Sequence, residues 1–144
     1  MTSDDALERI ASEIDRLGSE MPSRGPRFRC SAEYLIGRYV TLDDRGPIVG
    51  ALNRGGSAMI LVCKPRSVMH ALALLSVKDG YAFCFDSILR THYRPSNGLT
   101  FLRGPGFCKG PNLKIAVEHL ESDDPTRPYA LGPLEDRQAV LFEP

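Results

Sequence analysis

The chain lacks net charge, paired cysteines and any long apolar run, and each absence excludes a class of protein. Its 144 residues include 18 basic and 18 acidic side chains, so no basic field points to nucleic acid or an acidic membrane as a partner. The four cysteines form no Cys-x-x-Cys pair, which argues against a zinc ribbon or a thioredoxin-type dithiol. The scattered histidines and cysteines give no metal-ligand spacing. We therefore expect neither a metal nor another cofactor.

No signal peptide and no membrane span is visible in the sequence. The first residues are polar and acidic, and no apolar run approaches the roughly 20 residues that cross a bilayer. We therefore expect a cytoplasmic protein, or one exported without a cleavable signal peptide. The length fits one folding unit with a substantial core.

Turn residues and apolar periodicity divide the chain into an N-terminal amphipathic helix, residues 1–22, and a single α+β domain, residues 23–144. Ser3 precedes an apolar stripe of helical spacing and is the predicted N-cap. Helices first and a small antiparallel sheet after them indicate the α+β class. Within the domain, the periodicity predicts helices at 31–39, 47–53 and 112–120, and strands at 57–63, 68–77, 81–86 and 138–142.

The most informative stretch, residues 70–87, is predicted to form a β-hairpin with an imidazole at its start and a carboxylate at its end. The Lys-Asp-Gly sequence at 78–80 supplies a tight turn, so His70 and Asp86 are expected near each other at one sheet edge. A carboxylate that accepts from one imidazole nitrogen leaves the other free to deprotonate a thiol or hydroxyl. The pair is therefore predicted to activate a nucleophile.

Cys30 is the favoured nucleophile. The helix predicted from Ser31 would start beside it, and a helix N-terminus favours the thiolate form of a cysteine. A cysteine before an early helix, a histidine opening a strand and an aspartate 16 residues later form an order that resembles the papain-like cysteine protease superfamily. The likeness is greatest to its compact members: bacteriocin-leader peptidases, bacterial papain-like effector proteases and transglutaminase-like domains.

This resemblance covers residues 26–98 and implies a papain-like domain with N-terminal helices packed on a small antiparallel sheet. It also implies thiol-dependent acyl transfer on a protein or peptide substrate. Cys30 would attack a peptide or glutamine side-chain carbonyl, His70 would act as base and then acid, and Asp86 would orient the imidazole. Water as the acceptor gives proteolysis or deamidation, and an amine gives transamidation. Residues 24–29 hold no Gln or Asn for the oxyanion hole, so only the backbone N–H of Cys30 is assigned to it.

Two alternatives stay open. Cys108 precedes the helix predicted at 112–120, and the order His70, Asp86, Cys108 resembles the ubiquitin-like-protein proteases and acetyltransferase effectors. In the second alternative the chain is a non-catalytic interaction module, such as an effector, immunity or adaptor protein. It would dock a partner through its N-terminal helix or its Pro-rich tail.

The remaining cysteines and histidines are expected to be structural. Cys63 and Cys84 lie in apolar runs and are predicted to be small buried hydrophobes. His92 and His119 lack a comparable context, so exposed or structural positions are predicted for them.

Overall fold

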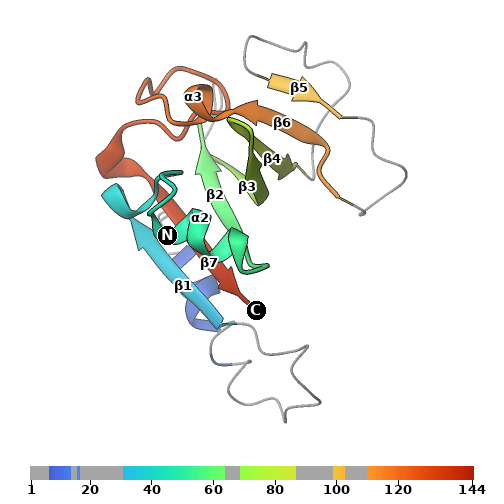
Figure 1. Ribbon diagram of the computed structural model, residues 1–144. Helices are drawn as coiled ribbons and strands as arrows, with labels where there is room; N and C mark the ends of the chain where they lie inside the picture. The colour runs from blue at the N-terminus through green and yellow to red at the C-terminus, as the bar shows by residue number, and fades with distance from the viewer. Residues whose placement is uncertain (1–6, 14–15, 17–30, 64–68, 87–98, 103–109) are drawn as a thin grey trace.

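The structure is a computed structural model that describes residues 7–13, 16, 31–63, 69–86, 99–102 and 110–144. Across these residues seven strands form one antiparallel sheet in the order β1, β7, β2, β3, β4, β6, β5 (Figure 1). The strands are β1 (Ser31–Ile36), β2 (Ser57–Val62), β3 (His70–Lys78), β4 (Tyr81–Phe85), β5 (Leu99–Phe101), β6 (Leu113–Ala116) and β7 (Gln138–Glu143).

Short helices accompany this sheet, and the chain is therefore an α+β protein. Residues 7–13 are helical. The other helices are α2 (Pro47–Asn53), α3 (Val117–Leu120) and the 3₁₀ helices η2 (Gly37–Tyr39) and η3 (Leu134–Asp136). None of the helices in the described ranges has the length and apolar character needed to span a bilayer.

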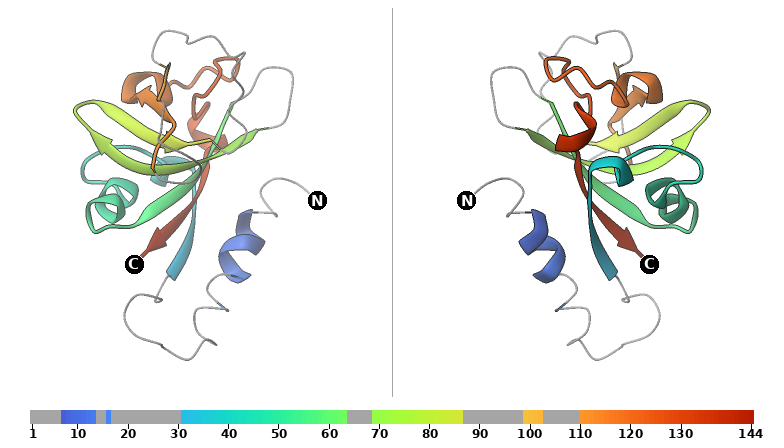
Figure 2. Two further views of the ribbon diagram at one scale, coloured as in Figure 1. Left: turned by 90° about the vertical axis from the view of Figure 1, so that its right-hand side faces the viewer. Right: turned by 90° about the vertical axis from the view of Figure 1, so that its left-hand side faces the viewer.

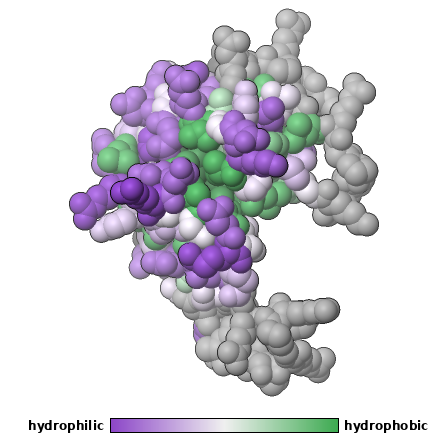
Figure 3. Space-filling view, viewed as in Figure 1, coloured by the Kyte–Doolittle hydropathy of each residue, from purple (hydrophilic) through white to green (hydrophobic). Residues whose placement is uncertain are grey.

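The sheet is covered on one face by α2 and on the other by the helix at 7–13 (Figure 2). Successive residues of β2 point to opposite faces, so Ile60 belongs to the larger core cluster beneath α2 and Leu61 to the smaller one. Leu7 and Ala11 of the N-terminal helix complete the smaller cluster. On the α2 face, apolar side chains gather at the centre and hydrophilic ones surround them (Figure 3).

Residues 31–39, predicted to be a helix, instead form β1 and η2. The apolar residues have helical spacing, but β1 pairs with β7 along its whole length. Ala32 and Tyr34 consequently face the smaller cluster, and Leu35 faces the larger one. Pairing with a distant strand therefore overrides the local helical pattern.

The helix predicted at 112–120 is wrong over its first half. Leu113 and Ile115 are fully buried, whereas Lys114 between them is not, and this alternation belongs to strand β6, which pairs with β4 and β5. Only α3 is helical. The other predicted elements of the domain are confirmed within one or two residues, as α2, β2, β3, β4 and β7.

A buried arginine joins three segments on the α2 face. Arg137, just before β7, is 4% exposed. Its guanidinium donates to the carbonyls of Gly132, Val40 and Glu121 at 2.9, 3.3 and 2.8 Å. The same group pairs with the Glu121 carboxylate at 3.3 Å, which also accepts from the Leu42 N–H at 2.9 Å. Arg137 therefore connects the start of β7 to the segments before α2 and after α3.

Candidate functional site

The β3–β4 hairpin brings His70 and Asp86 into direct contact. Asp79 and Gly80 at its turn have φ values of 54° and 79°, as a two-residue type I′ turn requires. At the open end of the hairpin, Nε2 of His70 lies 2.8 Å from Oδ1 of Asp86. The predicted proximity of the two side chains is therefore confirmed.

The pair lies at the border of the larger core cluster. His70 alternates with Leu72 and Leu74, which are buried in that cluster. The Asp86 side chain is completely enclosed, whereas the His70 side chain keeps 12% of its surface. A buried carboxylate requires hydrogen-bond donors, and the imidazole is the member of the pair that a reactant can approach.

Tyr129 hydrogen-bonds to the second carboxylate oxygen of Asp86. Its hydroxyl donates to Oδ2 at 2.7 Å, and its ring meets the His70 ring edge-on, with 6.1 Å between the ring centroids. Tyr129 lies in the loop after α3, and this loop is hydrogen-bonded to Cys63 at the end of β2. There the Tyr129 N–H donates to the Cys63 carbonyl and the Cys63 N–H to the Ala130 carbonyl, both at 2.8 Å.

Asn112 fixes the main chain of Asp86. Its Oδ1 accepts from the Asp86 N–H and its Nδ2 donates to the Asp86 carbonyl, each at 2.8 Å. The Asn112 N–H itself donates to the Cys84 carbonyl at 3.0 Å. Sequence reasoning missed both Asn112 and Tyr129, because they lie 26 and 43 residues from Asp86 and no local pattern connects them to it.

The arrangement assigns a role to each nitrogen of His70. An ionised carboxylate can only accept hydrogen bonds, so Nε2 must donate to Asp86. A neutral imidazole carries one proton, which leaves Nδ1 as an acceptor. Within the described part of the chain no group hydrogen-bonds to Nδ1. His70 can thus take a proton at Nδ1 from a thiol or hydroxyl, while Asp86 stabilises the imidazolium that results.

Cys30 lies outside the described residues, and its neighbour Ser31 lies far from His70. Ser31 pairs with Glu143 at one end of the sheet, and His70 pairs with Val62 at the other (Figure 1). The strand registers separate Ser31 from His70 by about 20 Å along the strands and about 14 Å across them. Because Ser31 begins a strand, the helix N-terminus predicted to favour a thiolate at Cys30 is not formed there.

Cys108 also lies outside the described residues, but Asn112, four residues after it, contacts Asp86. The Leu102 N–H donates to the Asn112 carbonyl at 2.9 Å, and the Asn112 side chain bonds to Asp86. The segment that contains Cys108 is therefore followed, at Asn112, by a residue in contact with Asp86.

The environment of the two described cysteines disfavours their thiolate forms. Both are free and buried. Burial raises the pKa of Cys84 to about 12, with a further contribution from the negative charge of Asp86. Burial likewise raises the pKa of Cys63, and the Asp124 carboxylate adds to this effect. The prediction that both are small buried hydrophobes is confirmed.

His119 has a structural role, as predicted. It is 4% exposed, and its Nε2 lies 2.7 Å from the Pro128 carbonyl, so it holds the loop that carries Tyr129. His92 lies outside the described residues.

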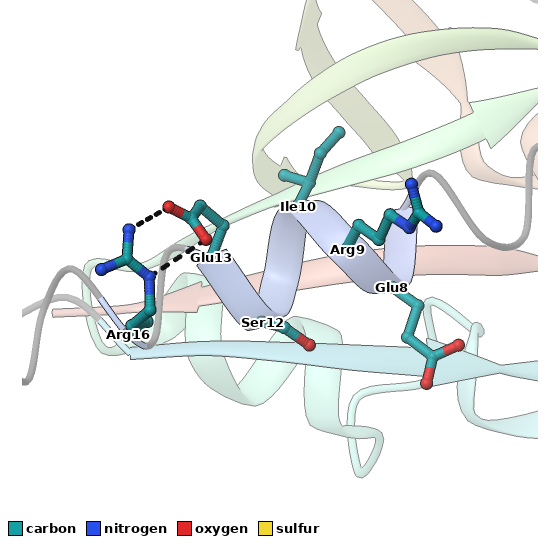
Figure 4. A pocket seen from close by; sticks show the side chains of 6 residues that line it. All are labelled: Glu8, Arg9, Ile10, Ser12, Glu13 and Arg16. Atoms are coloured by element: carbon teal, nitrogen blue, oxygen red, sulfur yellow. Dashed lines mark hydrogen bonds and ion pairs between the residues drawn. The ribbon is translucent and has the colours of Figure 1, made fainter.

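Two surface depressions contain neither member of the pair. One follows the outward side of the helix at 7–13, where Glu13 and Arg16 form an ion pair (Figure 4). The other lies between β1 and α2 and is lined in part by Tyr39, Arg45 and Arg54.

Comparisons with protein-family models, curated proteins and solved structures find no match for this chain. The resemblance to the papain-like superfamily therefore rests on the order and spacing of the residues given above.

Proposed function

We propose that this chain catalyses thiol-dependent acyl transfer on a protein or peptide substrate. The proposal is carried by the 2.8 Å contact between His70 Nε2 and Asp86 Oδ1, which leaves Nδ1 to serve as the base. In this reaction His70 takes the proton of a cysteine thiol, and the thiolate attacks a carbonyl carbon. The imidazolium then gives its proton to the departing amine, and a thioester remains. Water or a second amine cleaves the thioester, which gives hydrolysis, deamidation or transamidation.

As nucleophile we propose Cys108 in place of Cys30. Cys108 precedes Asn112 by four residues, so their Cα atoms are at most about 14 Å apart, and Asn112 bonds to Asp86. Cys30 adjoins Ser31, whose Cα is about 25 Å from that of His70 by the strand registers. A nucleophile has to lie within hydrogen-bond reach of its base. The resulting order, His70, Asp86, Cys108, is the one that resembles the ubiquitin-like-protein proteases and acetyltransferase effectors.

Alkylation by iodoacetamide at neutral pH tests both proposals, because thiolates react and thiols do not. Mass spectrometry gives a separate rate for each of the four cysteines in the native and the urea-denatured chain. We expect Cys108 to react about tenfold faster in the native chain, because a paired base increases its thiolate fraction. His70→Ala should abolish the acceleration. His92→Ala serves as the matched control and should leave it unchanged.

Two results would contradict these proposals in different ways. A fast, His70-dependent reaction at Cys30 supports acyl transfer and overturns the choice of Cys108. If both cysteines react no faster in the native chain than in the denatured one, the catalytic proposal fails, and the non-catalytic interaction module becomes the better description.

A further inference from the structure

We infer that Tyr129 is a positioning residue for the proposed base, because its hydroxyl holds one oxygen of Asp86 so that the other stays aligned with His70. The catalytic consequence of this inference rests on the proposed function. The positioning itself concerns only the Asp86–His70 pair and can be measured without any substrate.

The carboxylate of Asp86 is anchored at both oxygens. Oδ1 lies 2.8 Å from His70 Nε2, and Oδ2 lies 2.7 Å from the Tyr129 hydroxyl. The terminal torsion of an aspartate side chain has a broad energy minimum, so a carboxylate held at one oxygen alone can rotate about its Cβ–Cγ bond. The two bonds to Asn112 fix the main chain from which this side chain extends. Tyr129 supplies a further constraint, on the orientation of the carboxylate plane.

The backbone of Tyr129 gives a second, independent indication. Its φ is 64°, in the left-handed region that bulky residues rarely adopt. In the same loop Gly132 has a φ of 80°, so there the positive φ is accommodated by a glycine. At 129 the chain keeps a tyrosine in a similar conformation, and the two hydrogen bonds with Cys63 hold it. Strained non-glycine residues are concentrated at functional sites, and here the strained residue points its hydroxyl at Asp86.

A purely structural reading is that a buried tyrosine hydroxyl needs an acceptor and finds one in Asp86. Both readings predict that loss of the hydroxyl lowers stability. Only positioning predicts a change in the protonation pattern of the His70 ring, because a rotated carboxylate no longer selects Nε2 as the donor.

Tyr129→Phe removes the hydroxyl and keeps the ring. Tyr34→Phe is the matched control, because it removes a tyrosine hydroxyl that donates to Gln138 Oε1 at 3.0 Å, on the face of the sheet that packs against the N-terminal helix. Long-range ¹H–¹⁵N spectra of the labelled protein, assigned with His70→Gln, report the share of each His70 tautomer. We expect nearly pure Nε2–H in the wild type and in Tyr34→Phe, and a severalfold larger Nδ1–H share in Tyr129→Phe.

The alkylation assay supplies the functional readout. In Tyr129→Phe the proposed nucleophile should react severalfold more slowly, which is a part of the roughly tenfold acceleration that His70→Ala is expected to abolish. An unchanged His70 tautomer in folded Tyr129→Phe overturns the inference, whatever the cysteines do. A changed tautomer in a chain whose cysteines show no native acceleration upholds the positioning and rejects the proposed function.

A second experiment covers the case in which Tyr129→Phe does not fold. The wild-type sequence labelled with 3-fluorotyrosine retains the ring and carries a more acidic phenol, which is a stronger donor to Asp86. The His70 ring ¹⁵N resonances should then move relative to the unlabelled chain. Unmoved resonances would overturn the inference.

Discussion

The side-chain amide of Asn112 bonds to both main-chain polar groups of Asp86, at 2.8 Å each. These bonds follow the last register pair of β4 and β6, Cys84 with Leu113, and the backbone bond from the Asn112 N–H to the Cys84 carbonyl. A side chain thus takes the place of a partner strand at the residue whose carboxylate orients His70.

Removal of the Asn112 amide should lower the stability of the fold. We expect Asn112→Ala to lower the free energy of unfolding by about 2 kcal/mol, because two hydrogen bonds worth about 1 kcal/mol each disappear. Urea denaturation measures the change. Asn53→Ala removes an exposed amide at the end of α2 and should stay within about 0.5 kcal/mol of the wild type. Equal effects of the two substitutions would contradict the role given to Asn112.

The buried thiol of Cys84 predicts a loss of stability in alkali. Burial raises its pKa from 9.0 to about 12, so the folded chain binds this proton more tightly than the unfolded chain does. The corresponding stabilisation is complete below about pH 9 and is lost as the pH rises toward 12. Between these pH values the free energy of unfolding of the wild type should fall by up to about 1.4 kcal/mol per pH unit more than that of Cys84→Ala. Urea denaturation of both chains between about pH 8 and pH 11 tests this, and parallel slopes would refute it.

Alanine substitutions at the neighbouring Gly55 and Gly56 should lower stability for two different reasons, backbone strain at Gly55 and steric contact at Gly56. A Cβ at Gly56 would clash with the Phe142 carbonyl oxygen and would lie 2.9 Å from the Ala51 carbonyl oxygen. Gly55 has a φ of 91° and nothing within 4 Å. We expect Gly56→Ala to lower the free energy of unfolding by about 3 kcal/mol, because α2 and β7 must move apart. Gly55→Ala should lower it by about 1 kcal/mol through backbone strain alone. Chemical denaturation should reproduce this order, and the reverse order would be incompatible with the close approach at Gly56.

The ion pairs of Arg137 and Arg54 should differ in their contribution to stability. Arg137 is buried and donates to three main-chain carbonyls in addition to the Glu121 carboxylate, so Arg137→Ala should lower the free energy of unfolding by about 3 kcal/mol. Arg54 pairs with Glu143 at the surface, where the Arg54 side chain is 58% exposed, and Arg54→Ala should cost less than about 1 kcal/mol. Thermal and urea denaturation of the two variants provide the comparison, and a larger effect of Arg54→Ala would rule out the assignment.

Local sequence was sufficient for the two strands of the hairpin and for its turn, whereas the contact between His70 and Asp86 also needs a bulge in β3. The turn at Asp79 and Gly80 sets the register of the residues next to it. A register shift between Leu74 and Ser76 then places Asp86 on the same face of the sheet as His70. The helix α2 was predictable for a similar reason, since Pro47 at its start and Gly55 after its end are local signals.

Residues whose structure depends on distant partners were predicted incorrectly or missed. The apolar spacing of Ala32 and Leu35 suits a helix, and only pairing with β7 makes that segment a strand. In β6, the alternation of Leu113 and Ile115 with polar or small residues was a usable signal that the helical reading overlooked. For Asn112 and Tyr129 there was no such signal, because their contacts with Asp86 exist only after the sheet and the loop after α3 have packed.

The position of β7 between β1 and β2 has a consequence for the order of folding. Closing β1 onto β7 joins residues as far apart as Tyr34 and Gln138, which are 104 positions apart, whereas His70 and Asp86 are only 16 apart. Contacts between residues close in sequence form faster than contacts across long loops. We therefore expect the meander from β2 to β4 to gain protection first when hydrogen exchange is followed during refolding. The pairing of His70 with Asp86 then belongs to an early folding unit, and the C-terminal strand joins afterwards.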